Sequence, residues 1–312
     1  PLRYMWVDEG DGQIPALLAK AAAVLEHAPH LAGQTRKAAR PLPRSRNASR
    51  PTIAARGATT VVAWLEWQED RGDRLVAEVN QTVGVVVPEP EDLFRPTAAV
   101  TADGVPWLLF GRSGGAVGVW ACRFVDGRWS DPEPVSDTDG PSFNQEVAAS
   151  DDGGLHVCWQ GRVGGRFAVF ARRWNGRGWE PTVRVSDEES GNVWDPSLAV
   201  VDEGVAYAWT EYVDGSYAVA VRRVDARGAG PVRRLTGGSD YALHPSLATT
   251  TGGRLWCAFD VVSVHGHGGS GPTRLRPREG ATDDRDGMRE PGRSVPPELL
   301  PDMMALMDGV DG

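Results

Sequence analysis

A repeated unit in the middle of the chain restricts the folds open to it more than any other feature does. Its clearest copies read DPSLAV from Asp195 and HPSLAT from His244, a polar residue followed by Pro and a short apolar strand. Related segments start at Arg50, Arg95 and Asn144, so successive starts lie 45, 49, 51 and 49 residues apart. Self-similarity at such a period is typical of repeat architectures. We call the five first residues the anchor set: Arg50, Arg95, Asn144, Asp195 and His244.

Each unit holds further strands in register with its first strand. An aromatic residue closes the second strand, at Trp64, Phe110, Trp159, Trp209 and Phe259. The third strand appears as VWACRF, VFARRW and VAVRRV at steps of 50, and a fourth short strand follows it. Four short strands per unit predict the blade of an all-β propeller, with five repeats visible and six blades if the ring is complete. We expect the five aromatic side chains to pack between blades, because one blade cannot cover both its faces.

The segment RRLTGGSDYALHPSLATTTGGRLWCAFD resembles the β-propeller repeat of the TolB family, although its turns depart from the usual Ser-Pro-Asp-Gly. The segments DGRWSDPEPVS and GRGWEPTVRVS also resemble sialidase-like repeats, without the full Asp-box motif. The resemblance covers about residues 50 to 262 and implies the propeller fold. It favours an extracytoplasmic location. It says little about activity, because one fold hosts many functions.

The two ends of the chain lie outside the repeats. Residues 1–49 combine a segment similar to a blade strand, an Ala- and Leu-rich helix predicted at 14–28, and a basic linker. The propeller is expected over 50–276. Residues 277–312 are charged and without periodicity, and we expect a disordered tail with a short helix. The chain begins with Pro, so we expect it to be a fragment or a processed product.

Composition excludes several classes of protein. The net charge is −9 and the pI about 5.2, which argues against a nucleic-acid partner. The three cysteines form no Cys-x-x-Cys pair, and we expect them to be small buried strand residues. No run of about 18 apolar residues is present, so we expect no membrane span.

The anchor set is the first candidate site. If the Pro-containing strand is the innermost one, as the resemblance implies, its first residue lies near the mouth of the central channel. The anchor residues differ from one another while the residues after them repeat, which is the pattern of a binding surface, although loop drift would give the same pattern. Acidic residues after the second strand form a second candidate set: Glu66, Glu211 and Asp260.

Two further readings concern chemistry. His265 and His267 lie two residues apart in a Gly-rich stretch, where both side chains could bind a metal, but a flexible loop explains the same letters. Glu211 and Tyr212 offer the residue types of a sialidase nucleophile pair, but neighbours on a strand point to opposite faces.

The sequence therefore favours a non-catalytic binding or scaffold module. We expect a monomer that binds a protein, peptide or carbohydrate at the channel mouth and needs no cofactor. The alternative is the propeller part of a hydrolase, either a sialidase-like glycosidase or a metal-dependent enzyme whose catalytic domain lies beyond this sequence.

Overall fold

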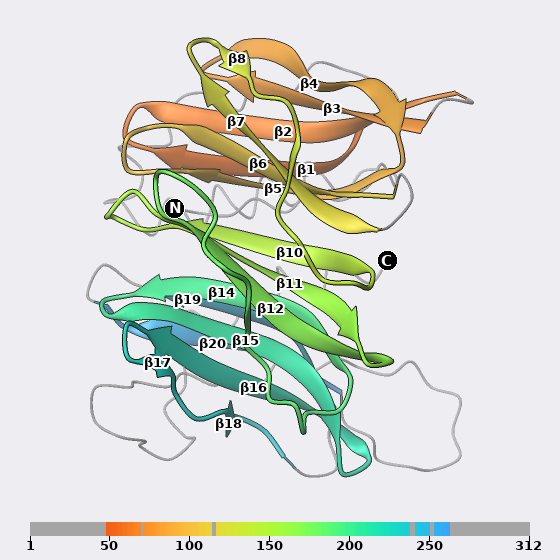
Figure 1. Cartoon of the computed structure of the whole chain (residues 1–312), viewed down its shortest axis with the longest axis vertical. Helices are drawn as coiled ribbons and strands as arrows, with labels where there is room; N and C mark the ends of the chain where they lie inside the picture. Colours follow the sequence, from red (N-terminus) through yellow and green to blue (C-terminus); the bar gives the residue numbers. More distant parts are fainter. Residues whose placement is uncertain (1–47, 70–71, 114–116, 238–240, 250–252, 263–312) are drawn as a thin grey trace, which may run out of the picture. The chain divides into compact units, whose positions relative to one another are not determined.

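The computed structural model describes residues 48–69, 72–113, 117–237, 241–249 and 253–262. Within these ranges the regular structure consists of β-strands, grouped into five antiparallel sheets that follow one another along the chain (Figure 1). The first sheet contains β1 (Ala48–Arg56), β2 (Thr59–Gln68), β3 (Gly72–Val79) and β4 (Thr82–Glu91). The second contains β5 (Leu93–Val100), β6 (Pro106–Arg112), β7 (Gly118–Val125), β8 (Arg128–Trp129) and β9 (Glu133–Pro134).

The third and fourth sheets repeat this plan, and the fifth shows two strands within the described residues. The third contains β10 (Ser142–Ala149), β11 (Leu155–Val163), β12 (Arg166–Trp174) and β13 (Val183–Arg184). The fourth contains β14 (Val193–Val201), β15 (Gly204–Val213), β16 (Ser216–Asp225), β17 (Gly228–Ala229) and β18 (Arg233–Arg234). The fifth contains β19 (Tyr241–Thr249) and β20 (Leu255–Val262).

Tight turns connect the strands of each sheet. The β15–β16 hairpin turns at Asp214 and Gly215, whose φ angles are 51° and 80°, and the β7–β8 hairpin turns at Asp126 and Gly127, with φ of 52° and 76°. Asp-Gly is the sequence that favours this left-handed two-residue turn, because its twist matches that of the flanking strands. The sheets are therefore built from local hairpins that the sequence specifies directly.

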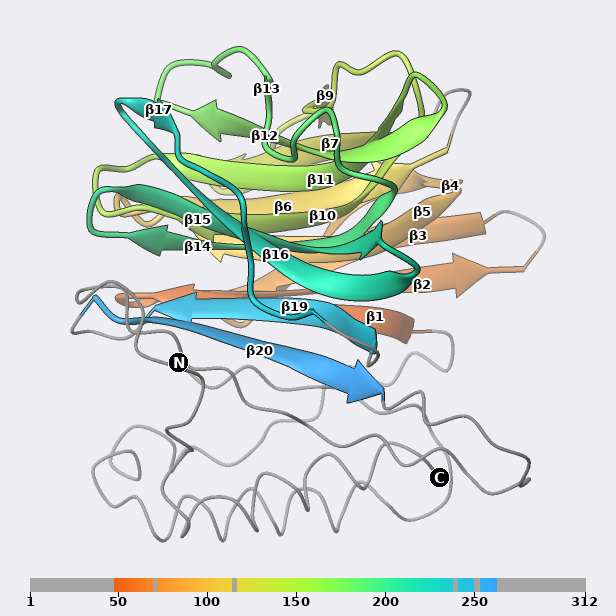
Figure 2. The same ribbon diagram turned by 90° about the horizontal axis from the view of Figure 1, so that it is seen from below.

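The first strand of each sheet lies beside the first strand of the next. Strand β1 contacts β5, β5 contacts β10, β10 contacts β14, and β14 contacts β19 (Figure 2). All five of these strands carry the repeat, with Gln145 in place of Pro in the third, and their contacts place them side by side through the successive sheets. The described residues form an all-β fold of successive antiparallel sheets that pack like the blades of a propeller.

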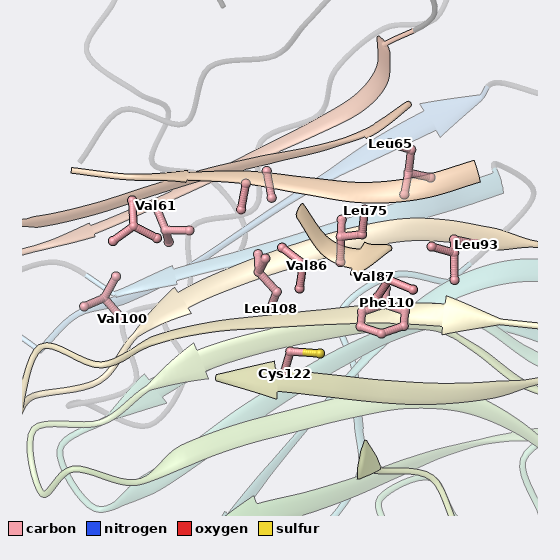
Figure 3. Packing of buried hydrophobic residues seen from close by; sticks show 13 residues of the cluster. Val61, Leu65, Leu75, Val86, Val87, Leu93, Val100, Leu108, Phe110 and Cys122 are labelled. Carbon is pink, nitrogen blue, oxygen red and sulfur yellow. The ribbon is translucent and has the colours of Figure 1, made fainter. Parts of the chain in front are cut away.

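Apolar side chains fill the space between neighbouring sheets. Between the first two sheets, Val61 and Leu75 pack with Leu108, Phe110 and Cys122 in one buried cluster (Figure 3). Similar clusters join the second sheet to the third, the third to the fourth and the fourth to the fifth. Each sheet thus buries its faces against its neighbours, which a single four-stranded sheet could not do alone.

Phe110, Trp159, Trp209 and Phe259 take part in this packing, as predicted. Trp64, Trp159 and Trp209 are buried, and Phe110 is inaccessible to solvent. Phe259 packs, partly buried, against the cluster between the last two sheets.

Two arginine side chains form hydrogen bonds between successive sheets. Arg172 of β12 donates to the carbonyl oxygen of Val135 at 2.8 Å, and Arg222 of β16 donates to that of Val185 at 2.6 Å. The two arginines lie 50 residues apart, as do their acceptors, so the repeat extends to individual hydrogen bonds.

The cysteines are free and buried, as predicted. Burial raises the pKa of Cys122 and of Cys257 to about 12, and it raises that of Cys158 well above its ordinary value. All three are therefore protonated near neutral pH and serve as apolar side chains. The predicted helix at 14–28, the first strand segment and the C-terminal tail lie outside the described residues. The count of six blades stays a prediction.

Candidate ligand-binding site

A β-bulge marks the same position in every inner strand. In each sheet the register between the first and second strand shifts at the anchor residue, for example between Trp194 and Ser197 of β14. Asp195 and Pro196 thus lie opposite the single residue Trp209. The same count holds in the other four sheets, where the opposing residue is Trp64, Phe110, Trp159 or Phe259. Pro suits this position in four of them because a bulged residue does not donate to the strand ladder.

The anchor residues all adopt a left-handed backbone. Their φ angles are 50° for Arg50, 45° for Arg95, 55° for Asn144, 50° for Asp195 and 51° for His244. This conformation is uncommon for residues other than Gly, although Asn, Asp and His adopt it more readily than most. Five such residues at one register position mean that the fold repeatedly accepts backbone strain to direct a side chain. Sequence reasoning missed the bulge, although Asn, Asp and His among the anchors were a signal for it.

In the second and third sheets, the anchor side chains form one hydrogen-bonded group. Arg95 donates to Asn144 Oδ1 at 3.1 Å and to Glu146 Oε1 at 3.1 Å. Asn144 in turn donates from Nδ2 to Gln160 Oε1 at 3.0 Å. Gln145, which replaces Pro in this repeat, is buried and donates to the carbonyl oxygen of Arg95. The side chains of Glu146 and Gln160 were not predicted, because they lack a counterpart of the same type in the other repeats.

In the fourth and fifth sheets, His244 lies between two carboxylates. Its Nδ1 is 3.0 Å from Asp260 Oδ2, and its Nε2 is 3.5 Å from Asp195 Oδ2. The backbone N–H of His244 donates to Thr210 Oγ1 at 3.1 Å, which ties the bulge of one sheet to the second strand of its neighbour. His244 is exposed, and the two aspartates are partly buried. A neutral imidazole can donate to one of these carboxylates, and an imidazolium can donate to both.

Arg50 completes the anchor set on the first sheet. It is exposed, and its positive charge acts on Asp73 of β3. Burial raises the pKa of Asp73, the negative charge of Asp92 raises it as well, and Arg50 partly offsets both effects. The Arg50 end of the set therefore combines a cation with nearby acidic groups.

The second candidate set divides into two kinds of position. Asp260 pairs with Leu243, the residue before an anchor, so it occupies the same position as Gln160 and Thr210. Glu66 and Glu211 lie one residue later in their strands. Because successive strand residues point to opposite faces, Asp260 joins the anchor set and the two glutamates do not.

Glu66 and Glu211 occur in two copies of one arrangement. Trp64 Nε1 donates to Glu66 at 3.0 Å, and Arg74 binds the same carboxylate at 2.6 Å. Likewise Trp209 Nε1 donates to Glu211 at 3.4 Å, and Arg234 forms an ion pair with it. The Glu211 side chain has no exposed surface, whereas Tyr212 is 46% exposed. The two members of the sialidase-type pair thus lie in separate environments.

His265 and His267, for which the sequence left metal binding and a flexible loop open, lie outside the described residues. Across the described ranges, no group of three or more His, Cys, Asp or Glu side chains is placed to hold a metal ion. In the same ranges, no helix is long and apolar enough to cross a membrane.

Comparison with known proteins supports the fold and leaves the function open. No family model and no curated protein matches the chain. Among solved structures, it is similar to a protein of unknown function from Dyadobacter fermentans, with a TM-score of 0.55 at 14% identity, over 76% of this chain and 80% of that one. At this identity the likeness concerns the fold alone.

Two other similar structures superpose less closely. An α-L-arabinofuranosidase from Lactobacillus brevis has a TM-score of 0.48 at 10% identity, covering 80% of this chain and 95% of that one. TolB from Acinetobacter baumannii has a TM-score of 0.47 at 16% identity, covering 71% and 53%.

Proposed function

We propose that the protein is a β-propeller module that binds a ligand at the anchor set and performs no chemistry on it. The observation that carries this proposal is the left-handed bulge at all five anchors. Bulges often re-aim a side chain next to a functional site, and backbone strain at equivalent positions is retained where it serves a purpose. The repeat supplies the scaffold, and the side chains that differ between repeats supply the chemistry.

Contacts at the far end of the inner strands favour approach from the anchor end. Arg56 is the last residue of β1, and its guanidinium donates to the carbonyl oxygen of Ser150 at 3.2 Å and pairs with Asp151. This contact joins the first sheet directly to the third, although the second sheet lies between them in the chain order. A ligand that reached the inner strands from that end would have to displace it.

The distribution of charge favours a ligand that carries both signs. The anchors of the first two sheets are Arg50 and Arg95, the second of which pairs with Glu146, whereas the last two sheets present Asp195 and Asp260 around His244. Complementary charges fix the orientation of a ligand more than they add affinity. A short peptide with acidic and basic groups matches this polarity better than a neutral sugar does, so we propose a peptide or a peptide segment of a protein as the ligand.

A thermal-shift screen tests the proposal. The method detects binding because a ligand that binds only the folded state raises the Tm of the protein. One panel contains short peptides that carry both charge types, and the other contains neutral oligosaccharides. We expect hits among the peptides, and we expect them to be lost in Arg95→Met. The exposed Arg128 lies on β8, far along the sheet from the anchors, and Arg128→Met is the matched control. Peptide hits that survive Arg95→Met and Asp195→Asn together would refute the anchor set as the site.

A hydrolase is the second candidate, and a specific observation favours it. Asp195, Asp260 and Glu146 place three carboxylates among the groups that contact the anchors, and paired carboxylates carry out glycoside hydrolysis. This candidate predicts turnover of aryl arabinofuranosides or xylosides that disappears in both Asp195→Asn and Asp260→Asn. Turnover of that kind would replace the non-catalytic proposal.

A further inference from the structure

Four aromatic side chains gather where the fourth and fifth sheets meet. Tyr217 of β16 is at the centre, with ring centroids 5.6 Å from Trp194, 5.1 Å from Tyr212 and 5.1 Å from Tyr241, all edge to face. Trp194, Tyr212 and Tyr217 come from β14, β15 and β16, and Tyr241 comes from β19. We call these four residues the aromatic cluster. Three of the five tyrosines in the chain are in it.

The aromatic cluster is accessible to solvent. Tyr212 is 46% exposed, and the other three side chains are partly exposed. Four of the five repeated aromatics of the second strands, in contrast, are buried. Packing of the core therefore does not account for the aromatic cluster, which extends the interface of these two sheets outward.

The aromatic cluster lies at the acidic end of the anchor set. Trp194 directly precedes Asp195, and its strand partner is Thr210. The hydroxyl of Thr210 accepts the backbone N–H of His244, the residue between Asp195 and Asp260. The aromatic rings and the two carboxylates thus meet at the same end of the same two sheets.

Charge decides which ligand group suits this place. Asp195 and Asp260 share the single imidazole of His244, so the three side chains carry a net charge of −2 or −1, depending on whether the imidazole is protonated. At the other anchors the charges are more evenly matched, because Arg95 pairs with Glu146 and Arg50 acts on Asp73. Aromatic faces attract cations through their quadrupole, and Tyr and Trp do so more strongly than Phe.

We propose that the aromatic cluster, with Asp195 and Asp260, receives the cationic side chain of a Lys or Arg residue in the ligand. The proposal rests on the proposed function, since it names the ligand group that the acidic end of the anchor set recognises. The carboxylates provide the opposite charge, and the rings cover the aliphatic stem and attract the charged head.

The test is ¹⁹F NMR of the full chain labelled with 3-fluorotyrosine, titrated with pentalysine, pentaglutamine, pentaglutamate or xylotetraose. Pentalysine is expected to shift the signals of Tyr212, Tyr217 and Tyr241 and to leave the buried Tyr207 unchanged. The two other peptides are expected to cause no comparable shift. Equal shifts from pentaglutamine, or no shift from pentalysine, would overturn the proposal, and a response to neutral xylotetraose alone would assign the site to a sugar.

Variants separate the two proposals. Asp195→Asn is expected to weaken pentalysine binding about fivefold or more, because it removes one carboxylate and keeps a residue that tolerates the left-handed backbone. The exposed Asp126 also has a positive φ, so Asp126→Asn is the matched control and is expected to change binding less than about twofold. If Asp195→Asn and Tyr217→Leu leave pentalysine binding unchanged, this inference fails. The proposed function still stands in that case, provided that peptides from the thermal-shift screen bind in a way that depends on Arg95. The absence of any peptide binding would overturn both.

Discussion

The two Trp–Glu–Arg arrangements give a prediction in which burial alone sets the size of the effect. In the fourth sheet the Glu211 side chain is completely buried, and Arg234, which neutralises it, is 51% exposed. In the first sheet the Glu66 side chain keeps 14% of its surface and Arg74 keeps 35%. Both glutamates also accept a hydrogen bond from a Trp two residues earlier in the same strand.

The perturbation is Arg234→Met, which keeps the aliphatic stem and removes the charge. Breaking a buried ion pair by removing one partner typically costs about 3–5 kcal/mol, because the other charge is left without compensation. Since Arg234 is half exposed and water already screens part of the pair, we expect a cost of about 3 kcal/mol. For a protein of this size that corresponds to a fall in Tm of roughly 6–12 °C.

The matched variant is Arg74→Met, for which we expect a cost of about 1 kcal/mol because water reaches the Glu66 carboxylate. Chemical denaturation of both variants at neutral pH measures the difference. The double variant Glu211→Gln with Arg234→Met should recover much of the loss, because an uncharged amide can still accept the hydrogen bond from Trp209. Equal costs for the two Arg variants, or a loss below about 1 kcal/mol in Arg234→Met, would refute the reasoning.

Three other predictions follow from the described residues. Burial, together with the positive charge of Arg173, lowers the pKa of His156 to about 4. As the pH falls below the ordinary histidine pKa of 6.5, His156 therefore takes up a proton in the unfolded chain but not in the folded protein. Stability should therefore fall by up to about 3 kcal/mol between pH 6.5 and pH 4, and His156→Gln should remove that part of the denaturation profile. A Cβ on Gly111 would clash with the ring of Phe94, whereas one on Gly84 would meet open space. Gly111→Ala should therefore lower the Tm and Gly84→Ala should change it little, and equal effects would contradict the packing. Arg50→Gly should leave stability unchanged or raise it by up to about 1 kcal/mol, because Gly adopts the left-handed backbone freely, and a clear loss in calorimetry would show that this conformation carries no strain.

The repeat made the strands predictable, because its period, its aromatics and its Asp-Gly turns are local signals. The packing of Trp159 and Trp209 between sheets followed from the same pattern. The left-handed bulge was not predicted, because a Pro after a polar residue is equally compatible with a regular edge strand. Asn144, Asp195 and His244 at one register were the available clue.

The grouping of Glu66, Glu211 and Asp260 shows where sequence spacing loses precision. In the sequence all three come just after the apolar part of the second strand, but a difference of one residue reverses the face to which a strand side chain points. The aromatic cluster was also beyond the sequence, because Trp194 and Tyr241 lie 47 residues apart and meet through the packing of two sheets.

The most direct test of the central claim is a crystal structure of the protein with the best peptide from the thermal-shift screen. The account predicts that the peptide lies across the anchor set, with an acidic group near Arg95 and a basic group between Asp195 and the aromatic cluster. A peptide bound at the outer strands or at the Arg56 end, with the anchor side chains untouched, would contradict it.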